Sequence, residues 1–153
     1  MIQIGGGNGG AQFQPSLLLH LAECLHEDAL DGQWITPQVL EGVAEFENVP
    51  LAACYAATLF APDLEFQAEC DIQFEICMAG CVQKNAAGLL TQLLSISQGR
   101  ISSGKTSFDV VPRGCLDACD FGPILRTRSD AGTFVHTNIQ PEGVSAIVTA
   151  VCD

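Results

Sequence analysis

The chain has 153 residues, of which 48% are apolar and 16% charged, so it can bury a core and is not a disordered segment. Its formal net charge of −12 argues against nucleic acid or an anionic membrane surface as a partner. Residues 1–83 contain no lysine or arginine, and all six basic residues lie between Lys84 and Arg128. The acidic half is either a solvated surface or a docking face for a basic partner subunit.

The first 14 residues are rich in glycine and precede the first predicted helix. Residues 5–10 satisfy the pattern GxGxxG, but a dinucleotide fold needs a strand before these glycines and a second strand soon after them. Neither is predicted, so we expect residues 1–14 to form a flexible tail. No basic segment precedes an apolar stretch, and the longest apolar run, Leu51 to Ala61, is too short to span a bilayer. We therefore expect a cytoplasmic protein without direct membrane insertion.

Three helices are predicted in the region that follows. The first covers residues 15–30 and stops at Asp31-Gly32; the second starts at the N-cap Thr36; the third covers residues 50–60. The second helix is predicted to bury one apolar face, which comprises Val39, Leu40, Val43 and Phe46. We expect residues 15–66 to be a helical docking region.

The pattern changes after residue 67. Alternating apolar residues predict a strand over residues 72–76, and a leucine-rich helix follows over residues 82–97. A strand over 107–111, a hairpin of residues 124–128 and 133–137, and a helix from Pro141 complete the pattern. This order predicts an α/β domain over residues 67–153, with helices packed on a central sheet.

Four of the eight cysteines form two pairs with the same C-x3-C spacing, each after a predicted strand. They are Cys77 with Cys81 and Cys115 with Cys119. Four thiolates are the ligand set of a [2Fe-2S] cluster or of a structural zinc ion. Zinc sites and redox dithiols usually have C-x2-C spacing, which favours the cluster. Structural zinc, a redox dithiol and ordinary buried cysteines remain alternatives.

The other cysteines have no partner at ligand spacing. Cys24 and Cys54 fall within helical patterns and are expected in the core, while Cys70 could compete with Cys77 as a ligand. Cys152 lies at the C-terminal end. The three histidines are scattered, and none is expected to bind a metal: His20, His26 and His136.

Basic residues lie close to both cysteine pairs in the sequence. An iron–sulfur cluster on four thiolates carries net negative charge, which nearby cations and N–H donors stabilise. Lys84 and Arg113 are the expected cations.

The second cysteine pair lies in a longer motif. Gly104-Lys105-Thr106-Ser107-Phe108-Asp109 precedes Cys115-Leu116-Asp117-Ala118-Cys119, and Gly122-Pro123 follows. With these residues the chain resembles the small thioredoxin-like [2Fe-2S] subunit of NADH:quinone oxidoreductase. It is equally similar to the matching subunits of NAD-linked hydrogenases and formate dehydrogenases. The resemblance covers residues 17–151 and implies a thioredoxin-like [2Fe-2S] domain preceded by a small helical layer.

The resemblance also implies a cofactor and partners. One [2Fe-2S] cluster would be held by Cys77, Cys81, Cys115 and Cys119. The chain would dock on a flavin-bearing subunit that carries FMN and NAD(P), with further iron–sulfur subunits nearby, and would have no catalytic residue of its own. The alternatives are a free thioredoxin-like [2Fe-2S] ferredoxin and a zinc-stabilised adaptor without redox function.

Two departures from the family pattern stand out. The family has C-x4-C in its first pair, so this chain has a tighter first loop. Asp117 stands where the family has glycine. A carboxylate beside an anionic cluster disfavours the reduced state, unless Arg113 offsets its charge.

Overall fold

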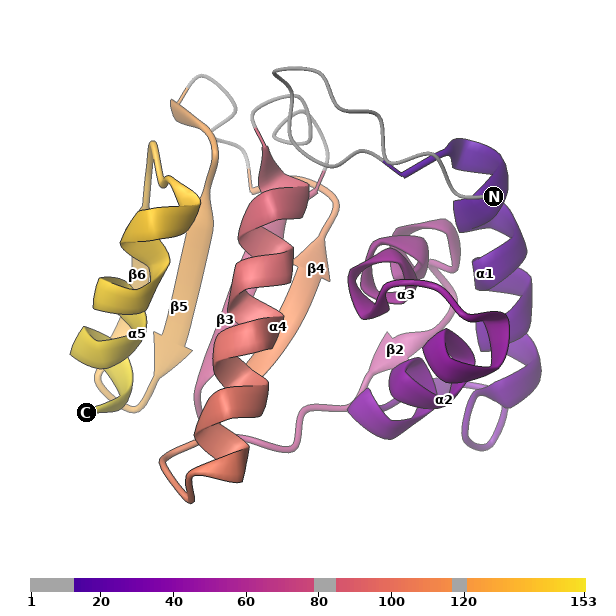
Figure 1. Cartoon of the computed structure of the whole chain (residues 1–153), viewed down its shortest axis with the longest axis horizontal. Coiled ribbons are helices and arrows are strands. Elements are labelled where there is room, and N and C mark those ends of the chain that lie inside the picture. Colours follow the sequence, from indigo (N-terminus) through magenta and orange to yellow (C-terminus); the bar gives the residue numbers. More distant parts are fainter. Residues whose placement is uncertain (1–12, 79–84, 117–120) are drawn as a thin grey trace. The chain divides into compact units, whose positions relative to one another are not determined.

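The structure, a computed structural model, describes residues 13–78, 85–116 and 121–153 (Figure 1). The chain divides into two compact units: a helical unit of residues 13–69 and a sheet unit that begins at residue 70 and continues to residue 153. The glycine-rich residues 1–12, for which a flexible tail is predicted, lie outside the described residues. Within the described ranges, no helix has the length and apolar character needed to cross a membrane.

The helical unit contains the three predicted helices and a short pair of parallel strands. Its elements are α1 (Pro15–Asp28), β1 (Trp34–Ile35), α2 (Pro37–Glu47), α3 (Leu51–Ala57), η1 (Thr58–Phe60) and β2 (Glu65–Phe66). The predicted cap of α2 is confirmed, because the Thr36 hydroxyl oxygen accepts a hydrogen bond from the Val39 N–H at 3.3 Å. The strand pair was not predicted, since two residues are too few to show an alternating pattern.

The three helices of this unit pack against one another through small and aliphatic side chains. Its fully buried residues include Leu21, Leu25, Leu40 and Ala53. The prediction that Phe46 shares the buried face of α2 is wrong, because its side chain is 88% exposed. Phe46 lies about 120° around the helix from Leu40, and Ala44 contacts the core in its place.

The sheet unit has the predicted α/β architecture. Its elements are β3 (Gln73–Cys77), α4 (Ala86–Ser102), β4 (Asp109–Arg113), β5 (Leu125–Ser129), β6 (Gly132–His136), η4 (Pro141–Gly143) and α5 (Val144–Cys152). The strand order is β4-β3-β5-β6, with β3 and β4 parallel and the other pairs antiparallel. The predicted hairpin is confirmed, while β4 begins two residues later than expected and α4 continues past Ser97 to Ser102.

The two faces of this sheet differ. Helices α4 and α5 lie on the same face, where Phe74 and Ile76 of β3 are fully buried (Figure 1). The rings of Phe74 and Phe108 are 4.5 Å apart, and the predicted apolar face of α4 is buried. Because side chains alternate along a strand, Glu75 and Cys77 belong to the opposite face.

Candidate metal centre

Cys77 and Cys115 lie at the same edge of the sheet, the edge at which the parallel strands β3 and β4 end. Cys77 is the last residue of β3 and pairs with Arg113, the last residue of the parallel strand β4. Cys115 follows two residues later. The carboxyl ends of neighbouring parallel strands meet at one edge, so this topology brings together residues that are far apart in the sequence.

The local hydrogen bonds hold Cys77 against the segment that carries Cys115. The Cys77 thiol donates to the Gly114 carbonyl at 3.9 Å, and its N–H donates to the Ile124 carbonyl at 3.3 Å. The Met78 N–H donates to the Arg113 carbonyl at 2.8 Å, which continues the strand pairing past Cys77. Cys77 is buried and Cys115 is exposed.

This donor set fits one edge of a four-thiolate site. Both described thiols are soft sulfur ligands, and they lie on adjacent segments that the sheet fixes. The remaining predicted ligands, Cys81 and Cys119, lie outside the described residues, as do Lys84 and Asp117. The four-cysteine ligand set therefore stays a prediction, of which the structure describes two members.

Cys70, the competing ligand considered from the sequence, lies at the opposite end of β3 and β4. Its N–H donates to Asp109 Oδ2 at 2.8 Å, and its Sγ lies 3.4 Å from the Ser107 hydroxyl oxygen. Asp109 is the first residue of β4, whereas Cys115 follows the last one. This placement argues against Cys70 as a ligand in a site with Cys115.

A buried carboxylate surrounded by arginines lies beside the cysteine edge. Glu75 in β3 is fully buried and contacts arginines from both neighbouring strands. Arg113 Nε lies 3.0 Å from Glu75 Oε1, Arg128 Nε lies 3.1 Å from Oε2, and Arg126 Nε also donates to Oε2. Three guanidinium groups around one carboxylate leave this network with net positive charge.

The arginines keep Glu75 ionised. Burial by itself would raise the pKa of the Glu75 carboxyl, but hydrogen bonds from Arg126 and Arg113 and their charges outweigh it and hold this pKa below its usual value. Arg113 was expected to balance the charge of a cluster. The structure places it in contact with Glu75, so part of its charge is already paired.

Sequence reasoning missed Glu75. A glutamate between the apolar residues Phe74 and Ile76 of one strand was the available indication, because such a residue needs cationic partners when buried. The alternation in Arg126-Thr127-Arg128 places two arginines on one face of β5. The register between β3 and β5 that aligns these arginines with Glu75 cannot be read from either segment by itself.

The cysteines of the helical unit differ from one another. Cys54 is fully buried, as predicted, and its pKa is raised to about 11 by burial and by the nearby Cys24 and Glu47. The prediction that Cys24 lies in the core is wrong, because it is only partly buried on α1 and contacts His20 and Glu47. It lies beside the buried stripe formed by Leu21 and Leu25.

An α/β sheet unit with two thiols where its parallel strands end is consistent with an iron–sulfur protein of the thioredoxin-like class. The family model of thioredoxin-like [2Fe-2S] ferredoxins matches residues 14–152, and the chain belongs to this family. The family implies a [2Fe-2S] cluster and electron transfer as its function.

Solved structures of a thioredoxin-like [2Fe-2S] ferredoxin from Aquifex aeolicus are similar to part of the chain. The wild-type structure at 1.5 Å has 19% sequence identity and a TM-score of 0.46, and covers 52% of this chain and 84% of that one. A cysteine-to-serine variant has the same identity and a TM-score of 0.44, and covers 50% of this chain and 82% of that one. No curated protein matches the chain.

Proposed function

We propose that the chain is the electron-transfer subunit of a multisubunit NAD(P)H-linked oxidoreductase and docks on a flavin-bearing subunit. FMN and NAD(P) would be bound by that partner. The observation that carries the proposal is the position of Cys77 and Cys115 at one edge of the sheet, in a chain that belongs to a [2Fe-2S] family. A cluster bound there supplies one-electron transfer.

The chain's own residues have two tasks in this function. The parallel pairing of β3 and β4 fixes the positions of Cys77 and Cys115. The arginines around Glu75 contribute net positive charge on the face of the sheet that includes Cys77, which favours an anionic group at that edge. The exposure of Cys115 leaves the edge open to a partner.

Exposed apolar side chains support a permanent partner. In the sheet unit, Phe121 follows the second cysteine segment and is 58% exposed. In the helical unit, Phe46 is 88% exposed, although the same helix buries Leu40 and Val43. Large aromatic side chains are enriched at the centres of protein interfaces, so both are candidates for contact with the partner.

The proposal is tested by isolating the tagged full-length chain from its native source at low and high salt. We expect flavin and iron to co-purify with it at both salt concentrations, and NAD(P)H to reduce the cluster of the assembly but not that of the separated chain. Phe46→Ser should weaken co-purification without lowering stability, because the side chain packs little in the folded chain. Ile101→Ser, which alters an exposed residue near the end of α4, is the matched control.

Two results would replace this proposal. An iron-containing chain that purifies alone, and associates only weakly and in a salt-sensitive way, would be a free ferredoxin. A colourless chain with tightly bound zinc and no iron would be a structural adaptor.

A further inference from the structure

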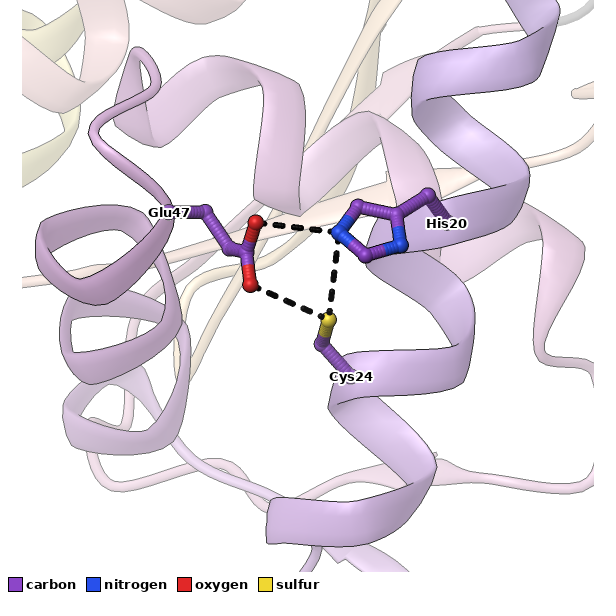
Figure 2. A group of neighbouring side chains, drawn as sticks. All are labelled: His20, Cys24 and Glu47. Carbon is purple, nitrogen blue, oxygen red and sulfur yellow. Dashed lines mark hydrogen bonds and ion pairs between the residues drawn. The ribbon is translucent and has the colours of Figure 1, made fainter.

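Three different metal-binding side chains converge in the helical unit, far in sequence from the predicted cluster ligands. Figure 2 shows His20 and Cys24 of α1 pointing toward Glu47 at the end of α2. His20 Nε2 lies 2.9 Å from Glu47 Oε2 and 3.8 Å from Cys24 Sγ, and Cys24 Sγ lies 3.6 Å from Glu47 Oε1. His20 and Cys24 are four residues apart, which places them on one face of the helix.

The geometry does not fit a nucleophilic triad. In such a triad the two ring nitrogens of histidine have different partners: one faces the nucleophile and the other faces the carboxylate. Here the same atom, Nε2, is the neighbour of both Cys24 and Glu47. Burial and the Glu47 carboxylate also raise the pKa of the Cys24 thiol, which is the opposite of activation. One donor atom from each of the three residues lies within 4.8 Å of the other two, which is a cluster and not a relay.

The separations between these donors match a tetrahedral metal site. With bonds of about 2.3 Å to sulfur and about 2.0–2.1 Å to nitrogen or oxygen, the donors of a zinc ion lie about 3.3–3.6 Å apart. The separation of 3.6 Å between Cys24 Sγ and Glu47 Oε1 lies within this range, while His20 Nε2 is 2.9 Å from the other carboxylate oxygen, Oε2, and 3.8 Å from Cys24 Sγ, within about 0.4 Å of the range. Small side-chain rotations are enough to admit an ion.

The surroundings favour a cation. Residues 1–83 contain no lysine or arginine, so no such side chain of this region competes with a metal for Glu47. Glu23 and Glu27 add negative charge around His20. One thiolate, one carboxylate and a neutral imidazole carry two negative charges, which a divalent ion neutralises.

We propose that His20 Nε2, Cys24 Sγ and a carboxylate oxygen of Glu47 bind a divalent ion of the zinc class, with water as the fourth ligand. The ion joins α1 to the end of α2 and thereby stabilises the helical unit. His20 is exposed, so the site exchanges its ion with solvent and its fourth position is open. The site is separate from the four cysteines predicted to hold the cluster.

The test uses the full-length chain with its cluster assembled, so that the cluster cysteines are occupied. Competition with a chromophoric zinc chelator measures the number of zinc ions bound and their Kd. We expect one zinc ion per chain, and each of the variants Cys24→Ala, His20→Ala and Glu47→Gln should weaken zinc binding at least about 10-fold. Added zinc should also raise the Tm of the wild-type helical unit but not that of the variants.

Matched controls separate this site from general thiol or histidine binding. Cys54→Ala removes the neighbouring buried cysteine, and His26→Ala removes a second histidine of the same helix; both should bind zinc like the wild type. Glu47→Gln keeps the shape of the side chain and therefore tests the site even if Cys24→Ala does not fold. Equal zinc affinity in the wild type and Glu47→Gln would overturn the proposal, as would the absence of zinc binding by the chain with its iron–sulfur cluster assembled. A cadmium-113 resonance typical of one sulfur ligand with nitrogen and oxygen would support it.

Discussion

The interacting polar side chains of the helical unit and of the sheet unit differ in how deeply they are buried. In the helical unit, His20, Cys24 and Glu47 lie at the surface between two helices, where water can reach them. In the sheet unit, Glu75 is fully buried beneath side chains from both neighbouring strands. Residues four apart on a helix can share a face that is open to solvent. A side chain of a central strand is flanked on its face of the sheet by side chains of the strands on both sides.

This difference has consequences for how each unit responds to a change. Charged groups at the surface are screened by water and contribute little to stability, while a buried charge that loses its partners is costly. We therefore expect the sheet unit to be sensitive to single polar substitutions. The helical unit should depend mainly on its apolar core.

The largest effect is expected at the cysteine edge. Cys77→Ser and Cys115→Ser should each abolish or strongly weaken the cluster, because each removes a predicted thiolate ligand. Visible absorption and iron content of the purified variants measure this. Cys152→Ser, which changes a cysteine outside the predicted set, is the control; a coloured Cys77→Ser variant with full iron content would remove Cys77 from the ligand set.

The next effect concerns the buried charge. Glu75→Gln should lower the free energy of unfolding of the sheet unit by about 3–5 kcal/mol, because it leaves three arginines without their carboxylate. Urea unfolding followed by circular dichroism measures the change. Glu142→Gln, at an exposed position of the same unit, should change stability by less than about 0.5 kcal/mol. Equal stabilities of the two variants would contradict the stabilising role assigned to the buried Glu75 carboxylate.

A substitution in the helical core tests whether the units are independent. Leu25→Ala should destabilise the helical unit by about 2–5 kcal/mol, because it leaves a cavity at a fully buried position. Leu19→Ala, on the same helix but 53% exposed, should have a much smaller effect. The cluster content should be unchanged in both variants, as measured by visible absorption in native buffer. Loss of the cluster in Leu25→Ala would show that the helical unit supports the metal centre.

The smallest effect is a difference in pH response between the units. In the helical unit, hydrogen bonds to Asp63 and to the Ala22 carbonyl raise the pKa of His26, so the folded state binds more protons. Its contribution to stability is complete below the unfolded pKa of about 6.5 and is lost as pH rises through the folded pKa. In the sheet unit, burial lowers the pKa of His136. The contribution of His136 to stability is present above about pH 6.5 and is lost as the pH falls through its folded pKa.

Lowering the pH from about 8 to about 6 should therefore stabilise the helical unit relative to the sheet unit. Urea unfolding at several pH values, with probes in each unit, measures this. His26→Asn should reduce the stability that the helical unit gains at the lower pH. His136→Asn should reduce the stability that the sheet unit loses there. The same direction of change in both units would contradict the assignment.

Much of the fold is determined by local patterns in the sequence. Leucines at helical spacing predicted α1 and α4, alternation of Phe74 and Ile76 predicted β3, and the turn at Asp130 predicted the β5–β6 hairpin. These features depend on backbone geometry over a few residues, so a single segment is enough to reveal them. The two C-x3-C pairs favoured a [2Fe-2S] cluster, the cofactor that the family model also implies, while the four-cysteine ligand set stays a prediction.

Tertiary structure alone decided the pairings between distant residues. Glu75 meets Arg113 and Arg128 only because β3 lies between β4 and β5, and the sequence does not specify that strand order. Glu47 reaches His20 and Cys24 only through the packing of α2 against α1. Local spacing determines which face of an element a side chain occupies, whereas its partner on that face depends on how whole elements pack to bury their apolar surface.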